Sequence, residues 1–73
     1  MVTFGERLRQ LRINDGATQP MMAKFLDCTK QHYQRFEYDK IDVPSSKLIA
    51  LADYFQVSLD FLTGRTDNPK INN

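Results

Sequence analysis

The sequence has few of the residues that build metal sites and disulfides. Among its 73 residues there is one cysteine, Cys28, one histidine, His32, and no tryptophan. One cysteine cannot form a disulfide within the chain, and one cysteine with one histidine cannot supply the four ligands of a structural zinc site. No apolar run approaches the roughly 20 residues of a membrane-spanning helix, and the stretch MVTFGERLRQ lacks the apolar core of a secretory signal. We therefore expect a cytoplasmic protein that uses no metal, no cofactor and no membrane.

Glycine and a charge excess of one sign are also scarce. With three glycines, the chain has no glycine-rich loop that could cradle a phosphate, and no spacing pairs a nucleophile with a base. These absences argue against an enzyme. The net charge is only +1, which does not by itself indicate a nucleic-acid partner. Residues 1–40 hold seven Lys/Arg against five Asp/Glu, whereas residues 41–73 hold three against four.

What the sequence does contain is helical periodicity, and no stretch alternates with the period of a strand for long enough to matter. A chain of 73 residues provides one domain, and its 41% hydrophobic and 26% charged residues are a normal globular balance. We predict an all-α domain of five helices over residues 1–64, followed by a polar tail, residues 65–73, that should be loose. The predicted helix starts are Thr3, Thr18, Thr29, Pro44 with Ser45 or Ser46, and Ser58.

The apolar residues of the second segment, TQPMMAKFL, show how these helices should pack. Met22, Ala23 and Leu26 form one apolar edge at helical spacing. Met21 and Phe25 stand beside that edge. We expect the two to widen the core-facing stripe, with an exposed patch for a partner as the alternative.

The stretch TKQHYQRFE, residues 29–37, separates into two faces when it is wound as a helix at about 100° per residue. Tyr33 and Phe36 fall together on a narrow apolar edge, and His32 lies at its boundary. The broad opposite face carries long hydrogen-bonding side chains and no carboxylate. By itself, this face also fits an ordinary solvated helix.

Only Asp27 and Cys28 separate this segment from the helix before it, which is the spacing of a tight helix–turn–helix connection. Such turns commonly use a residue in the left-handed conformation, and aspartate is among the few residues besides glycine that tolerate it. Asp39 follows the next helix in the same way.

The run TQPMMAKFLDCTKQHYQRFEYDK, with LRQLR before it and LIALADYFQVSLDFLTGRTDNP after it, resembles the Cro/phage-repressor (XRE-like) helix-turn-helix transcriptional regulators. The resemblance covers about residues 4–69 and rests on Gln19, Ala23, Glu37 and the motif VSLDFL. It implies a compact five-helix, lambda-repressor-like domain that binds operator DNA. This chain departs from the family pattern at Asp27 and Asp39, where the family usually has glycine, and both add negative charge near a surface that should meet phosphates.

The resemblance also implies roles for single residues. Helix 29–37 would lie in the major groove, where glutamine pairs with adenine, and arginine or lysine with guanine. The implied base contacts are Lys30, Gln31, Gln34 and Arg35. The implied contacts to the DNA backbone are Thr18, Gln19, Tyr38, Lys40, Ser45 and Ser46, with plain solvation as the alternative for Lys40. Arg12 and Glu37 would form a structural ion pair between two helices.

We therefore interpret the chain as a sequence-specific double-stranded DNA-binding regulator, a repressor, associated with the nucleoid. One short recognition helix reads only about four or five base pairs, so a homodimer on a palindromic operator is expected. The expected dimer surface is formed by helices 48–62 and the tail from Arg65. Two alternatives use the same fold: a protein-interaction module that does not read DNA, and an antitoxin-like partner that binds a toxin and represses its own operon.

Overall fold

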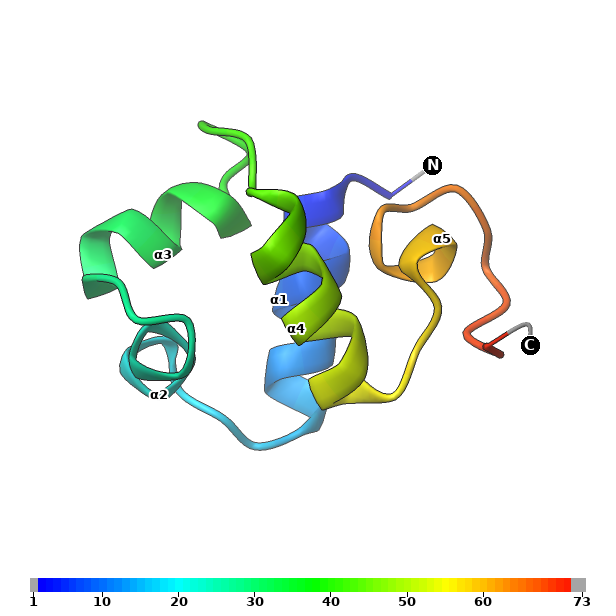
Figure 1. Cartoon of the computed structure of the whole chain (residues 1–73), viewed down its shortest axis with the longest axis horizontal. Coiled ribbons are helices and arrows are strands. Elements are labelled where there is room, and N and C mark those ends of the chain that lie inside the picture. The colour runs from blue at the N-terminus through cyan, green and yellow to red at the C-terminus, as the bar shows by residue number, and fades with distance from the viewer. Residues whose placement is uncertain (1, 72–73) are drawn as a thin grey trace.

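The structure is a computed structural model that describes residues 2–71, and these residues form five helices and no strand. The predicted all-α, five-helix class is confirmed. No helix within the described part of the chain is both long and apolar enough to cross a membrane. The helices are α1 (Phe4–Asn14), α2 (Gln19–Phe25), α3 (Lys30–Glu37), α4 (Ser45–Phe55) and α5 (Leu59–Leu62) (Figure 1).

Hydroxyl side chains begin four of the five helices, as the sequence predicts. Each accepts a hydrogen bond from the backbone amide three residues further on, an amide that has no partner inside the helix. In α1, Glu6 completes a capping box by accepting a bond from the cap residue's own amide. Helix α4 differs, because its cap is Pro44 and no side chain caps it. The four hydroxyl caps are Thr3, Thr18, Thr29 and Ser58.

The five helices end in the same backbone conformation. A residue with positive φ follows each helix, and the next amide donates to the carbonyl five residues before it, as in Cys28 N to Ala23 O at 2.9 Å. Asp27 and Asp39 take the left-handed conformation that the sequence indicates, with φ of 57° and 58°. Gln56 does so after α4 at φ 56°, which the sequence analysis did not identify because glutamine rarely adopts this conformation.

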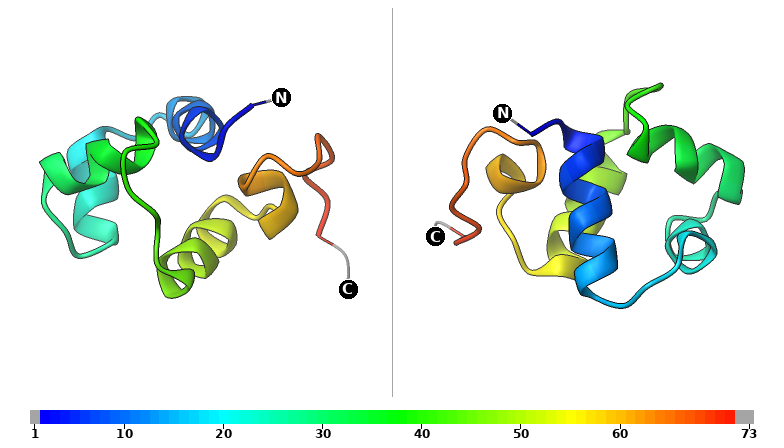
Figure 2. Two further views of the ribbon diagram at one scale, coloured as in Figure 1. Left: turned by 90° about the horizontal axis from the view of Figure 1, so that it is seen from above. Right: turned by 180° about the vertical axis from the view of Figure 1, so that it is seen from behind.

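All five helices contribute to the core. Helices α2 and α3 lie together at one end of the molecule, α5 and the tail lie at the other, and α1 and α4 stand between them (Figures 1 and 2). The predicted apolar edge of α3 is wholly buried. The largest fully buried side chains are Leu8, Met22, Tyr33, Phe36, Leu51 and Leu62.

Met21 and Phe25 do not widen the core stripe, and the expectation was wrong on this point. They are 56% and 46% exposed. Helix α2 has only seven residues and packs through Met22 and Ala23, so its neighbouring positions face outward. The Phe25 ring instead packs on the surface against the ring of Tyr54 in α4, with centroids 4.9 Å apart.

The polar tail, expected to be loose, is bonded to the helical part of the chain as far as Pro69. The amide of Ser58 donates to the carbonyl of Pro69 at 3.1 Å. Arg7, only 7% exposed, places its guanidinium 3.8 Å from the centre of the Phe61 ring and donates to Asp67 at 3.1 Å. A buried arginine needs a stacking surface and a charge partner, and the tail supplies the second. Residue 1 of the predicted domain and residues 72–73 of the predicted tail lie outside the described residues.

Candidate nucleic-acid interface

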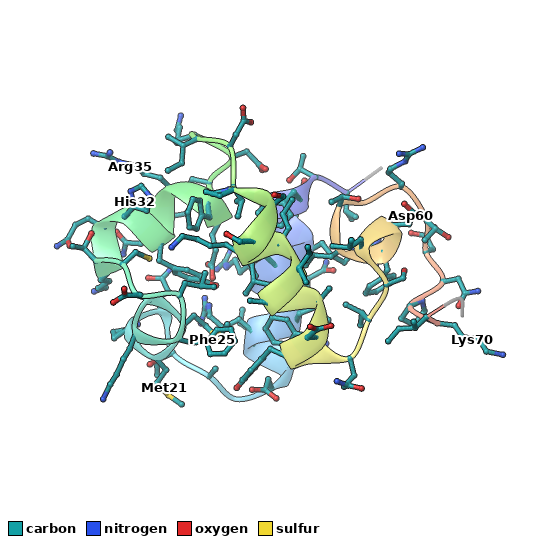
Figure 3. All side chains as sticks on the ribbon, viewed as in Figure 1. Met21, Phe25, His32, Arg35, Asp60 and Lys70 are labelled. Carbon is teal, nitrogen blue, oxygen red and sulfur yellow. The ribbon has the colours of Figure 1, made fainter. Side chains whose placement is uncertain are left out.

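The polar face of α3 is presented to solvent as one surface. Lys30, Gln31 and Arg35 are exposed, and Gln34 is half-buried between them and the body of the domain. Arg35 points away from the molecule in Figure 3. Tyr38, the cap residue that follows α3, is 58% exposed and lies near Lys30 of this face. The surface therefore carries two cations and two amides on a helix whose opposite side is fixed in the core.

His32 occupies the boundary between the two faces, where the sequence analysis placed it. It is half-buried and its ring meets the ring of Phe36 edge-on, with centroids 5.0 Å apart and planes at 79°. The imidazole thus helps to cover the aromatic edge of α3.

Arg12 and Glu37 join the end of α1 to the end of α3. Arg12 Nε donates to Glu37 Oε2 at 2.6 Å and Arg12 Nη2 donates to Glu37 Oε1 at 3.2 Å, so the guanidinium grips both carboxylate oxygens. A third donor of Arg12, Nη1, reaches the carbonyl of Ala17 at 3.1 Å. The side chain of Glu37 is fully buried, and that of Arg12 is 12% exposed.

The pair is held in its charged form. Burial by itself raises the pKa of the Glu37 carboxyl, but hydrogen bonds from Arg12 and Gln19 outweigh burial and leave this pKa below its ordinary value. The hydrogen bond to Glu37 raises the pKa of Arg12. The hydroxyl of Tyr33 is buried nearby and has no hydrogen-bond partner among residues 2–71, and burial together with the Glu37 charge raises the pKa of Tyr33. Glu37 is therefore a carboxylate that can only accept hydrogen bonds.

Two glutamines continue from this carboxylate toward the exposed face of α3. Gln19, at the start of α2, donates through Nε2 to Glu37 Oε1 at 3.2 Å. Gln34 donates through its own Nε2 to Gln19 Oε1 at 3.0 Å. These bonds brace α3 against α2, and they place Gln34 differently from Gln31, which lies on the same face without a comparable bond among residues 2–71.

A shallow basic hollow lies between the end of α1, the start of α2 and the polar face of α3. It brings together three cationic side chains, of which Arg12 is already paired with Glu37. Arg9 is one of them, and the sequence analysis did not select it. The available signal was its position three residues before Arg12, which places the two arginines on the same side of a helix. The polar and charged side chains of the hollow are Arg9, Arg12, Thr18, Gln19, Lys30 and Tyr38.

Three of the implied backbone contacts lie outside this hollow. Lys40 is exposed in the loop after α3, and Ser45 and Ser46 are exposed at the start of α4. No side chain among residues 2–71 caps α4.

The carboxylate of Asp39 is not directed at this surface. Its Oδ1 accepts from the amide of Gly5 at 2.9 Å, and its Oδ2 accepts from the hydroxyl of Thr3 at 2.6 Å. A carboxylate at the start of a helix meets the positive end of the helix dipole, so this charge stabilises α1. Asp27 is exposed in the turn between α2 and α3.

Residues 3–69 match a family model described as a helix-turn-helix domain. The chain belongs to the helix-turn-helix family. Helices α2 and α3 with the turn between them are the helix-turn-helix, and the family resemblance seen in the sequence is confirmed.

Three relatives from Bacillus subtilis (strain 168) carry the same domain. The chain is 41% identical over 59 residues to the SPbeta prophage-derived uncharacterized HTH-type transcriptional regulator YonR, covering 81% of this chain and 55% of the relative. It is 36% identical over 66 residues to the uncharacterized HTH-type transcriptional regulator YobD, covering 90% and 59%. It is 30% identical over 71 residues to the HTH-type transcriptional regulator ImmR, covering 97% and 56%. The chain thus spans a little over half the length of these relatives.

Proposed function

We propose that this helix-turn-helix domain binds double-stranded DNA in a transcriptional regulator, acting as a repressor at the nucleoid in the cytoplasm. The observation that carries the proposal is the exposed face of α3, which combines cations with amides and is held rigid by the buried edge behind it. Major-groove readers need such side chains on a fixed helix. The names of the relatives as HTH-type transcriptional regulators support the same class.

Each group of residues has a distinct role in this proposal. Side chains on α3 read base edges, and cations and helix starts around it hold the sugar–phosphate backbone. The proposed base contacts are Lys30, Gln31, Gln34 and Arg35. The proposed backbone contacts are Thr18, Gln19, Tyr38, Lys40, Ser45 and Ser46, to which the structure adds Arg9 as a further candidate.

We expect Gln31→Ala and Arg35→Ala each to weaken binding to the selected site by about 1–3 kcal/mol while changing binding to random duplex little. Lost base contacts remove sequence discrimination, whereas phosphate contacts act on every sequence. Fluorescence anisotropy with both duplexes measures the two affinities. Lys24→Ala removes an exposed cation of α2 that belongs to neither set of proposed contacts, and it serves as the control. Equal losses on both duplexes would show that Gln31 and Arg35 do not read bases.

A second candidate function, a protein-interaction module, is favoured by one observation. Met21 and Phe25 of α2, and Tyr54 of α4, which packs against Phe25, are large exposed apolar side chains. Retention on heparin or on random duplex at low salt separates the two candidates, because a module that does not bind DNA should flow through.

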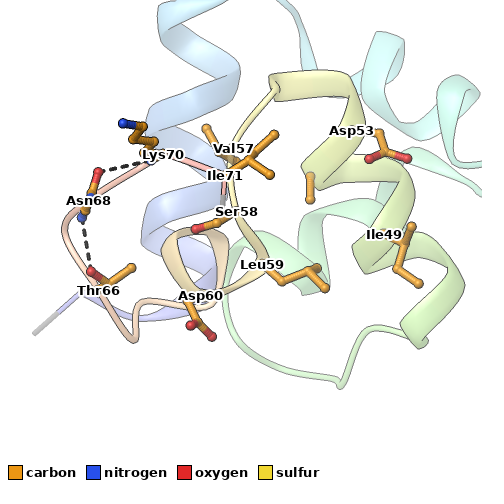
Figure 4. A pocket seen from close by; sticks show the side chains of 11 residues that line it. Ile49, Asp53, Val57, Ser58, Leu59, Asp60, Thr66, Asn68, Lys70 and Ile71 are labelled. Carbon is orange, nitrogen blue, oxygen red and sulfur yellow. Dashed lines mark hydrogen bonds between the residues drawn. The ribbon is translucent and has the colours of Figure 1, made fainter. Parts of the chain in front are cut away.

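A groove between α4, α5 and the tail is the surface we propose for dimerisation (Figure 4). Ile49, Leu59 and Ile71 are exposed along it, with Asp53, Asp60 and Lys70 at its polar positions. Helix α5 and the tail, which line this groove, lie at the opposite end of the molecule from α3 (Figure 1). A second copy could therefore pack there while both α3 helices remain free.

We expect two copies to bind one palindromic site, with their α3 centres about 34 Å apart in adjacent major grooves. If each copy neutralises about three phosphates, the slope of log affinity against log salt should be near −5. Leu59→Asp should abolish binding of the second copy and halve this slope. Met21→Asp introduces the same charge at the exposed apolar residues of α2 and should leave both unchanged. Sedimentation of the protein with DNA measures the stoichiometry. One protein per duplex, with no preference for inverted repeats, would contradict the dimer.

A further inference from the structure

We infer that the buried Arg12–Glu37 pair, acting through Gln19, fixes the orientation in which the side-chain amide of Gln34 faces the DNA. Gln34 then presents its oxygen to the bases in a fixed orientation, with one of its two N–H groups already bonded to Gln19. Gln19 and Glu37 are positioning residues in this scheme. The inference rests on the proposed function and concerns how one of its base contacts acquires a preference.

The direction of every bond in this relay follows from the carboxylate. Glu37 is gripped by Arg12 and accepts hydrogen bonds without donating any. The atom of Gln19 that meets it must therefore be the amide nitrogen, at 3.2 Å. This orientation turns the oxygen of Gln19 toward α3. Gln34 must therefore donate a hydrogen bond to that oxygen from its own amide nitrogen, at 3.0 Å. Turning either amide over would set oxygen against oxygen.

The outcome at Gln34 is an amide that cannot turn over freely. Its nitrogen is tied back toward α2, and its oxygen remains without a partner among the described residues. In the major groove, adenine N6 and cytosine N4 donate hydrogen bonds, whereas thymine O4 and guanine O6 accept them. An amide that can rotate accommodates either kind of group. The restrained amide of Gln34 should favour a base that places an amino group opposite its oxygen.

The position of Gln34 argues against a purely structural bond. The relay begins in a fully buried carboxylate and ends at a half-exposed side chain on the same face as Lys30 and Arg35. Gln31 provides an internal comparison, because it shares the face and lacks the bond to Gln19. One glutamine is restrained, and the other makes no side-chain hydrogen bond within the described part of the chain.

The first test measures base preference by selecting binding sites from random duplex with the wild type, Gln19→Ala, Gln34→Ala and the double variant. The wild type should discriminate about tenfold at one base-pair position, the size of one good side-chain contact. Gln19→Ala should lose most of this discrimination, and should lose nothing further in the Gln34→Ala background. Gln31→Ala should affect a different position, and its effect should add to that of Gln19→Ala.

A role of Gln19 in phosphate binding alone would weaken all sequences equally in both backgrounds, and that result would overturn the inference. Full discrimination retained in Gln19→Ala would overturn it as well.

The second test needs no DNA. The side-chain amide protons of Gln34 should exchange slowly in nuclear magnetic resonance spectra of the free protein, and Gln19→Ala should bring their exchange to that of Gln31. Unchanged amide signals in the variant would overturn the relay itself. If the wild type selects no sequence, the proposed function and the base-reading role of Gln34 fail together, while the amide signals still decide whether the relay exists.

Discussion

Replacing Glu37 by alanine should lower the free energy of unfolding by about 3 kcal/mol. The carboxylate is fully buried and accepts from both Arg12 and Gln19, so its removal leaves a mostly buried guanidinium without its partner. A domain of this size has a total stability of about 5–15 kcal/mol, so the loss is a large share. Urea unfolding followed by circular dichroism measures it. A double variant, Arg12→Leu with Glu37→Leu, should recover much of the loss because neither charge is then left alone.

The pH dependence of stability provides a second measurement on the same pair. The pKa of Glu37 is lower in the folded than in the unfolded chain. At a pH between these two values, the folded state therefore binds fewer protons than the unfolded state, and stability falls as the pH falls. The stabilisation from Glu37 is therefore present at neutral pH and is lost in acid, below about pH 4.5, as the carboxylate becomes protonated. Wild type and Glu37→Gln should converge in stability there. A difference between them that persists unchanged through this range would contradict the assignment.

Gly5→Ala should destabilise the domain by about 3 kcal/mol, although alanine is by itself the better helix residue by about 1 kcal/mol. A Cβ on Gly5 would overlap the carbonyl oxygen of Glu37 and would lie 2.8 Å from Asp39 Oδ2. To relieve this overlap, α1 must move away from the end of α3. That movement breaks the hydrogen bonds from Gly5 and Thr3 to Asp39. Overpacking and lost bonds together exceed the gain in helix propensity.

The melting temperature should fall by more than about 10 °C in Gly5→Ala. Gly16→Ala is the matched control, because a Cβ there meets nothing within 4 Å and the residue has φ of +75°. Its cost is backbone strain alone, about 1 kcal/mol. A Gly5→Ala variant as stable as the wild type would show that α1 and α3 are not in close contact at this point.

The features that could be predicted from the sequence depend on residues three or four positions apart. Thr3 with Glu6, and the hydroxyl caps of the later helices, are recognisable because a cap bonds an amide three residues along the same chain. The two faces of α3 follow from helical periodicity, so the buried positions of Tyr33 and Phe36 and the exposed positions of Lys30, Gln31 and Arg35 could be predicted.

The features that could not be predicted depend on approaches between distant segments. Met21 and Phe25 have the right spacing for a core, but whether a helix packs through one stripe or a wider one depends on which neighbours reach it. The contact of Arg7 with Asp67 joins residues 60 positions apart, so nothing local distinguishes Asp67 from any other exposed aspartate.

The arrangement of the candidate site shows the same division. From the sequence, Gln19 and Gln34 could be assigned to DNA contacts, and Arg12 with Glu37 to a structural ion pair, because the family resemblance implies these roles. Only the tertiary structure decided that the four form one connected relay, since α1, α2 and α3 must converge within hydrogen-bond distance for it to exist. Chemical type is a property of each residue, and the sequence determines it. The hydrogen-bond partner of each side chain, and the direction in which the side chain points, depend on the packing of the helices, which the structure alone supplies.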